Sequence, residues 1–142
     1  MGSIIEYDPA RDSALLTQCR DLHITCVLTD HAMMRFLPPF TEEKKGRMDE
    51  FYQTYSAEVE AGSRHIFLSV HEEAGGKQTV TGMVSLYKPL SETGPFRSIV
   101  GLLLVSPHHR KQGIARQMMA ALEKVALREH RELLVSIFSL FG

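Results

Sequence analysis

The sequence predicts a mixed α/β (α+β) fold, with helices flanking a mostly antiparallel sheet in the order β-α-α-β-β-β-α-β. Two observations carry this prediction. The apolar period alternates along the chain between about 3.6 residues, typical of helices, and about two, typical of strands. The chain has 142 residues, of which 44% are hydrophobic and 23% charged, as is usual for one globular unit. We therefore expect a single domain over residues 1–142.

The chain is expected to begin with a strand and a helix. Ser3–Tyr7 is short and β-rich, and the Asp8-Pro9 pair after it suits a turn or a helix start. From Ala10 to about Asp30, apolar residues recur every three or four positions and predict one buried helical stripe. Its members are Leu15, Leu16, Cys19, Leu22, Cys26 and Val27.

The two cysteines of this stripe, Cys19 and Cys26, would lie roughly 10 Å apart on a helix, beyond disulfide reach. With His23 they could also be read as metal ligands. A single helix rarely closes a tetrahedral site, and the sequence holds no second Cys/His cluster. We therefore expect both cysteines to pack in the core.

A loop and a second helix follow. His31–Phe40 contains Pro38-Pro39 and cannot stay helical; it either packs beneath the domain or lines a ligand pocket. Thr41 is expected to cap a helix over Glu42–Ala61, which Gly62 ends. The residues expected on its buried face are Met48, Phe51, Tyr55 and Val59.

The second half of the chain predicts three strands, a helix and a last strand. His65–His71 and Thr79–Leu90 form a hairpin, and Arg97–Val105 is the most apolar strand, as expected at a central position. Gly113–His130 has one apolar face and predicts a helix. A right-handed crossover then makes the last strand, Leu133–Phe138, parallel to the strand before the helix.

The charge balance excludes some partners. Sixteen Lys and Arg against seventeen Asp and Glu give a net charge of -1, so no overall field attracts nucleic acid or an anionic membrane. The longest strongly apolar run, Ile99–Val105, is too short to span a bilayer. Charged residues near the N-terminus interrupt any signal peptide. We expect a cytoplasmic protein with no metal, nucleic-acid or membrane partner.

The segment with the clearest chemistry follows the central strand. The strand runs into Ser106-Pro107, and Gly113 opens the next helix. Free backbone N–H groups of this turn and of the first helical turn would surround a point near the positive end of the helix dipole, which suits a pyrophosphate. Arg110 and Lys111 add charge, and the small Gly113 and Ala115 allow close approach. A solvated β-α turn fits the same features; a Walker A loop and the three-glycine dinucleotide fingerprint do not.

The pattern Val105-x-Pro107-x-x-Arg110-x-x-Gly113-x-Ala115 resembles the acetyl-CoA signature of the GNAT superfamily of N-acyltransferases. The order of elements resembles that family as well. Phe36 to Leu134 resembles the tabtoxin-resistance type, through the acidic helix, the hairpin, the signature and the Arg-Glu-Leu-Leu sequence that ends at Leu134.

The resemblance implies a specific site. Acetyl-CoA would lie where the central strand and the last strand separate, with its pantetheine arm hydrogen-bonded to the strand and its pyrophosphate held by the turn and the helix start. Acetyl transfer would go directly to the primary amine of a small molecule. The cofactor-binding residues implied are Leu103, Leu104, Val105, Arg110, Lys111, Gln112, Gly113, Ile114 and Ala115.

The catalytic groups are not identified by the motif. Many family members carry a polar or acidic group on the strand before the signature, whereas Ser98–Leu104 holds no titratable side chain here. Candidate bases elsewhere are His65, His71, Tyr87 and Glu92, each more typical of a surface or packing residue. His108 and His109 lie in the turn itself, where they could add positive charge or remain solvated.

The end of the chain also departs from the family pattern. The resemblance implies a further helix and two more strands, whereas Ser136–Gly142 is apolar and uncharged. We hypothesise that this tail is a gene-model or splicing artefact, or that the product is a shortened form. The alternative function is therefore a catalytically impaired acetyl-CoA-binding remnant. Such a chain could be completed by a partner, or by a homodimer through the exposed edge of the last strand.

Overall fold

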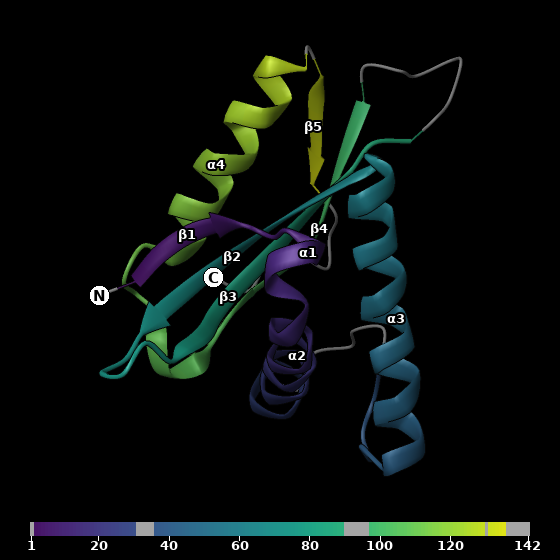
Figure 1. Ribbon diagram of the computed structural model, residues 1–142, viewed down its shortest axis with the longest axis vertical. Helices are drawn as coiled ribbons and strands as arrows, with labels where there is room; N and C mark the ends of the chain where they lie inside the picture. The colour runs from purple at the N-terminus through teal and green to yellow at the C-terminus, as the bar shows by residue number, and fades with distance from the viewer. Residues whose placement is uncertain (1, 31–35, 90–96, 130, 136–142) are drawn as a thin grey trace.

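The computed structural model describes residues 2–30, 36–89, 97–129 and 131–135. In this part of the chain, five strands form one sheet in the order β1-β2-β3-β4-β5 (Figure 1). Neighbouring strands from β1 to β4 are antiparallel, and β5 is parallel to β4, as the sequence predicts. The strands are β1 (Gly2–Glu6), β2 (Arg64–Glu72), β3 (Gln78–Tyr87), β4 (Arg97–Val105) and β5 (Glu132–Val135).

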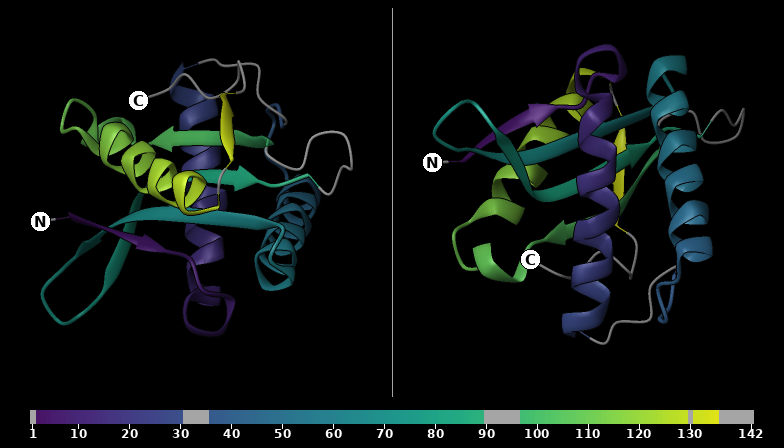
Figure 2. Two further views of the ribbon diagram at one scale, coloured as in Figure 1. Left: turned by 90° about the horizontal axis from the view of Figure 1, so that it is seen from above. Right: turned by 60° about the horizontal axis from the view of Figure 1, so that its bottom comes forward.

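Helices cover both faces of this sheet. Helices α2 and α3 lie on one face and α4 on the other (Figure 2). No helix among the described residues is long and apolar enough to cross a membrane. The helices are α1 (Pro9–Asp12), α2 (Leu16–Asp30), α3 (Glu42–Ala61) and α4 (Ile114–Arg128), with short 3-10 turns η1 (Ser13–Leu15) and η2 (Pro107–His109).

The first expected helix is divided near Asp12. Its carboxylate accepts hydrogen bonds from the backbone N–H of Asp8 and from the Arg11 guanidinium, and its backbone departs from helical geometry at φ -114°. Competition from a side chain that bonds to nearby backbone is the usual reason for such a break. On α2, after this break, Cys19 and Cys26 form no disulfide and are buried, so the expected core packing of both cysteines is confirmed.

The core has two parts because strand residues alternate between faces. Leu68, Met83 and Leu104 pack toward α2 and α3. Phe67 and Val84, each next to one of those residues in sequence, pack toward α4. The sheet is therefore buried on both sides, which explains the nearly continuous apolar runs of β2, β3 and β4.

Both ends of α3 agree with the sequence prediction. Thr41 accepts a hydrogen bond from the Lys44 backbone N–H, and Gly62 ends the helix at φ +86°. The buried face differs in part, because Met48 and Tyr52 are the fully buried members. The three other expected residues, Phe51, Tyr55 and Val59, are half-buried.

Some predictions fall outside the described residues. They concern residues 31–35 of the expected loop, the C-terminal ends of three expected elements at Leu90, His130 and Phe138, and the candidate base Glu92. The apolar tail over 136–142 also lies outside them.

Candidate functional site

A β-bulge interrupts β4 shortly before its end. Met83 of β3 pairs with Leu104, and Ser85 pairs with Gly101, so one extra residue of β4 lies between these pairs. Within this bulge Leu102 adopts a φ of +50°. A bulge bends its strand and leaves backbone groups out of the ladder.

The strand on the other side of β4, β5, stops pairing with β4 just before the bulge. β5 pairs with Arg97 to Val100 of β4, and no β5 residue among those described pairs with Gly101–Val105. Within the described part of the chain, this stretch of β4 therefore presents an edge without a strand partner, although the Val105 carbonyl accepts from side chains of Arg110 and Cys26. The family resemblance expects the pantetheine arm at this edge.

The turn after β4 is held by Ser106. Its backbone N–H donates to the Thr81 carbonyl, and its own carbonyl accepts from the backbone N–H of His109. The chain then passes through two left-handed residues, Lys111 at φ +63° and Gly113 at φ +79°, before α4 begins. This left-handed geometry is usual for glycine and rare for lysine.

The backbone N–H groups from residue 110 to residue 116 are free of acceptors among the described residues. The first intrahelical bond of α4 runs from the Gln117 N–H to the Gly113 carbonyl. These donors stand at the positive end of the α4 dipole. Their arrangement suits a bound anion with several oxygen atoms.

Arg110 joins this turn to α2. Its Nη1 and Nη2 donate to the two carboxylate oxygens of Asp30, both at 2.7 Å, and its Nε donates to the Val105 carbonyl at 3.3 Å. The hydrogen bond to Asp30 raises the pKa of Arg110, so the guanidinium stays charged. Asp30 lies 80 residues away in the sequence, and no local pattern identifies it as the partner.

The other expected cofactor residues take distinct positions around the turn. Leu104 and Val105 are buried, while Leu103 is partly buried and packs toward α4. The side chains of Lys111 and Gln112 are exposed. Ile114 is buried beneath the start of α4, and Ala115 is half-buried beside it.

The histidines proposed as bases are placed on the α4 face. His65 Nε2 lies 3.1 Å from a carboxylate oxygen of Glu129, with Glu6 on the other side of the ring at 3.8 Å. His71 lines a cavity of about 430 Å³ beside the start of α4. His109 also lines this cavity, and its buried Nδ1 has no hydrogen-bond partner among the described residues.

A side-chain cluster centred on Arg64 was not predicted from the sequence. The Arg64 side chain is buried, its Nε lies 3.2 Å from Glu58, and its Nη1 donates to Ser85 Oγ at 3.0 Å. The guanidinium lies 3.6 Å from the ring centre of Tyr55 and 4.8 Å from that of Tyr87, another proposed base. An arginine at the start of an apolar strand is the only signal that the sequence offers.

A second buried polar pair lies between α2 and α3. His23 Nδ1 and the Tyr52 hydroxyl share a hydrogen bond of 2.7 Å, and the buried His23 Nε2 has no partner among the described residues. Burial lowers the pKa of His23 to about 4 and raises that of Cys19 to about 12. His23 is therefore neutral at pH 7, and core packing accounts for it.

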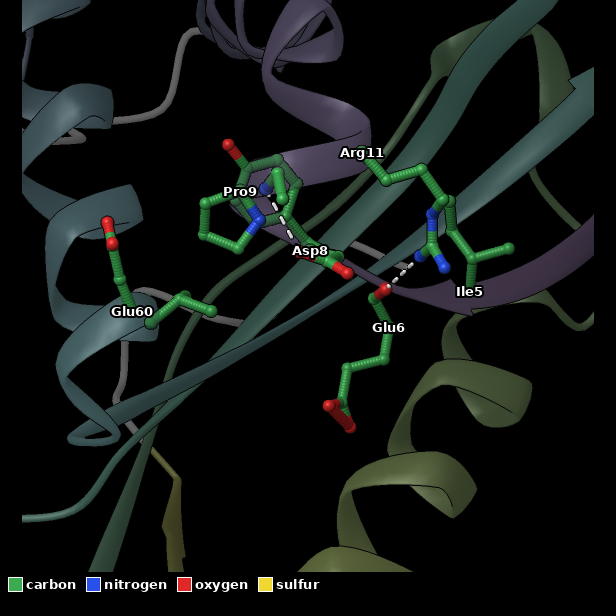
Figure 3. A pocket seen from close by; sticks show the side chains of 9 residues that line it. Ile5, Glu6, Asp8, Pro9, Arg11 and Glu60 are labelled. Carbon is green, nitrogen blue, oxygen red and sulfur yellow. Dashed lines mark hydrogen bonds between the residues drawn. The ribbon is translucent and has the colours of Figure 1, made fainter.

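A larger cavity, of about 830 Å³, lies between the β1–α1 turn and the end of α3 (Figure 3). Its polar groups stabilise the turn itself: Asp8 accepts from the Ala10 N–H, and Arg11 donates to the Glu6 carbonyl. None of the cofactor residues implied by the resemblance lines this cavity.

Solved structures with the same fold include acetyltransferases. A predicted acetyltransferase from Clostridium acetobutylicum with acetyl-CoA has a TM-score of 0.65 at 13% identity, covering 99% of this chain and 83% of that chain. The YncA protein of Salmonella typhimurium with its cofactor acetyl-CoA has a TM-score of 0.67 at 19% identity, covering 94% and 68%. An aminoglycoside 6'-N-acetyltransferase complexed with coenzyme A has a TM-score of 0.64 at 18% identity, covering 94% and 60%.

The sequence itself matches the acetyltransferase (GNAT) family over residues 16–137. Comparison with curated protein sequences gives no match. The finer resemblance to the tabtoxin-resistance type stays a prediction. The family match spans both helices of one face, the sheet from β2 to β5 and the turn before α4. The chain therefore belongs to the acetyltransferase (GNAT) family.

Proposed function

We propose that this chain is an N-acetyltransferase that transfers the acetyl group of acetyl-CoA directly to a primary amine of a small molecule. The observation that carries the proposal is the set of free backbone N–H groups over residues 110–116, at the positive end of α4. Several N–H donors at a helix start suit the pyrophosphate of coenzyme A. Relatives of the same fold with acetyl-CoA or coenzyme A support this choice.

The residues proposed to hold acetyl-CoA form two groups. Backbone groups of Leu103, Leu104 and Val105 would bind the pantetheine arm along the free edge of β4. The turn and the helix start would bind the pyrophosphate through Arg110, Lys111, Gln112, Gly113, Ile114 and Ala115. The position of a Cβ on Gly113 meets no atom within 4 Å, so space for a ligand adjoins the backbone there.

Acetyl-CoA supplies an activated acyl group as a thioester. A backbone N–H of β4 beside the bulge would donate to the carbonyl oxygen and stabilise its developing negative charge. The bond from nitrogen to carbon forms as the bond from carbon to sulfur breaks, and the proton lost by the amine ends on the sulfur. Ser98–Leu104 offers no titratable side chain, so the amine must lose its proton to water or to a group outside this stretch.

Thermal unfolding with and without acetyl-CoA tests the binding step. A ligand at about 100 times its dissociation constant should stabilise the fold by about 2.7 kcal/mol. Release of coenzyme A in the presence of primary amines then tests the transfer. An unchanged melting temperature at millimolar acetyl-CoA would refute the proposal.

Two glycine substitutions separate binding from folding. Gly113 and Gly62 both begin or end a helix at a positive φ, +79° and +86°, with open space around the Cβ position. Gly113→Val and Gly62→Val should therefore lose similar stability. Only Gly113→Val should abolish the increase in melting temperature with acetyl-CoA. If this variant keeps the increase, the pyrophosphate does not bind at Gly113.

A second candidate function is acetyl-CoA binding without transfer. The lack of a titratable side chain on Ser98–Leu104 favours it. A thermal shift with acetyl-CoA, together with no release of coenzyme A across a panel of primary amines, would support this alternative over the transferase.

A further inference from the structure

A pocket of about 510 Å³ lies between α3 and the start of β2. Three aromatic rings line it, those of Phe36, Phe51 and Tyr55, and the charged part of its wall consists of Arg47, Glu50 and Arg64. The aromatic rings lie in edge or tilted contact, with Phe51 5.5 Å from Phe36 and 4.4 Å from Tyr55 between ring centres. The pocket therefore offers an apolar wall beside a cationic group.

The guanidinium of Arg64 is only partly used by the protein. The residue is 8% exposed, its Nε faces Glu58, and its Nη1 donates to Ser85. Its Nη2 makes no hydrogen bond among the described residues and is not a fully enclosed atom, while the guanidinium as a whole is ion-paired with Glu58. Because Arg64 also lines the pocket, its remaining N–H groups can donate to an acceptor oxygen of a bound molecule.

Two hydrogen bonds through the Ser85 hydroxyl connect Arg64 with β4 next to its bulge. Arg64 Nη1 donates to Ser85 Oγ at 3.0 Å, and Ser85 Oγ donates to the Gly101 carbonyl at 3.2 Å. Gly101 directly precedes Leu102 of the bulge. A molecule held by Arg64 would therefore lie beside the segment where the acyl group is proposed to bind.

Charges around the pocket are balanced. Arg64 is paired with Glu58 and Arg47 with Glu43, while Glu50 also lines the pocket. Acidic partners beside both cations disfavour a multiply charged anion such as a phosphate and suit a molecule that carries one charge of each sign.

We propose that the acceptor is an amine that also carries a carboxylate and an apolar group, as an apolar or aromatic amino acid does, and that Arg64 binds its carboxylate. This inference rests on the proposed N-acetyltransferase function. The planar guanidinium matches a carboxylate, and the aromatic wall accommodates the apolar group. The amine is then directed toward β4.

L-phenylalanine and 2-phenylethylamine form the test pair, because they differ only in the carboxylate. With acetyl-CoA, the wild-type chain should release coenzyme A with a kcat/KM at least about tenfold higher for L-phenylalanine, as expected for a charge-assisted hydrogen bond. Arg64→Gln should remove this preference, so that kcat/KM for the two amines becomes equal within about twofold. Arg128→Gln, an exposed change in the last turn of α4, should keep the preference.

A binding measurement makes the test independent of turnover. Saturation-transfer NMR on the wild-type chain with coenzyme A should detect L-phenylalanine at a concentration where 2-phenylethylamine gives no signal. Equal signals, no signal from either compound, or a preference that persists in a folded Arg64→Gln chain would overturn the assignment. If acetyl-CoA does not raise the melting temperature of the wild-type chain, the proposed function is contradicted instead. The NMR comparison of the two amines would still decide the role of Arg64.

Discussion

The β4–α4 loop and the pocket lined by Arg64 lie toward opposite ends of β4, and they are built in different ways. The β4–α4 loop, residues 106–113 together with the first turn of α4, offers mainly backbone N–H groups. The Arg64 pocket is made from side chains of α3 and β2, with Ser85 of β3 behind them. The first depends on backbone conformation, which a few adjacent residues set; the second depends on packing between distant segments. The loop should therefore respond to changes in backbone position, and the pocket to loss of single side chains.

Adding a Cβ at Gly82 of β3 should have the largest effect on the position of the β4–α4 loop. It would lie 3.0 Å from Met118 Cε, 3.1 Å from Ile114 Cγ2 and 3.1 Å from the Leu104 carbonyl oxygen. Gly82→Ala should therefore push the start of α4 away from β4, with a loss of about 2–3 kcal/mol in urea unfolding. Acetyl-CoA affinity, measured by titration calorimetry, should fall with it.

Gly101→Ala is the matched control on β4. Its Cβ would meet only Ser85 Oγ at 3.5 Å, so the expected loss stays below about 1 kcal/mol. Similar losses of stability and affinity in the two variants would contradict a loop position set by the contact between Gly82 and α4.

Asp30→Ala tests how Arg110 serves the loop. The paired side chains are 25% and 15% exposed, so the change leaves a partly buried arginine without this partner and should cost about 2 kcal/mol in urea unfolding. Asp21→Ala on the same helix removes an exposed carboxylate from Arg20, which keeps Asp49 as a partner, and should cost below about 0.5 kcal/mol.

Asp30→Ala also distinguishes between two roles of the Arg110 guanidinium. If Arg110 anchors the loop to α2, Asp30→Ala weakens acetyl-CoA binding, and this is the expected result. Tighter binding by Asp30→Ala would show instead that Asp30 competes with the pyrophosphate for the Arg110 guanidinium.

The free energy of unfolding should fall on acidification because of His23, which is buried between α2 and α3. Burial lowers the pKa of His23 to about 4, so between about pH 6.5 and pH 4 the unfolded chain binds a proton that the folded chain does not. This contribution should lower the free energy of unfolding by about 1–2 kcal/mol from pH 6.5 to 5. His23→Gln should show a flatter pH dependence in that interval. Equal slopes in urea unfolding would contradict a neutral buried His23.

Most of the fold could be predicted because apolar period and end signals are local. The bounds of α3 follow from Thr41 and Gly62, and those of β4 from its apolar run and Pro107. The break near Asp12 escaped prediction because it depends on hydrogen bonds of one carboxylate rather than on the apolar stripe. Tyr52 escaped because the side of α3 that is buried depends on where α2 packs.

The two sites differ in the same way. The β4–α4 loop could be located from the spacing of Pro107, Arg110 and Gly113, since proline and glycine constrain the backbone directly. The Arg64 pocket could not, because Tyr55, Arg64 and Ser85 meet only after α3, β2 and β3 have packed. The partnership of Arg110 with Asp30 was missed for the same reason.

The backbone amide NMR spectrum of the ¹⁵N-labelled chain during titration with acetyl-CoA tests the backbone-built pyrophosphate site most directly. The amides of residues 110–116 should show the largest downfield shifts, because these N–H groups would donate to the pyrophosphate. ADP, which carries the pyrophosphate, should reproduce those shifts, and pantetheine, which lacks it, should not. Unchanged amides over 110–116 in a chain that binds acetyl-CoA would contradict the backbone-built site.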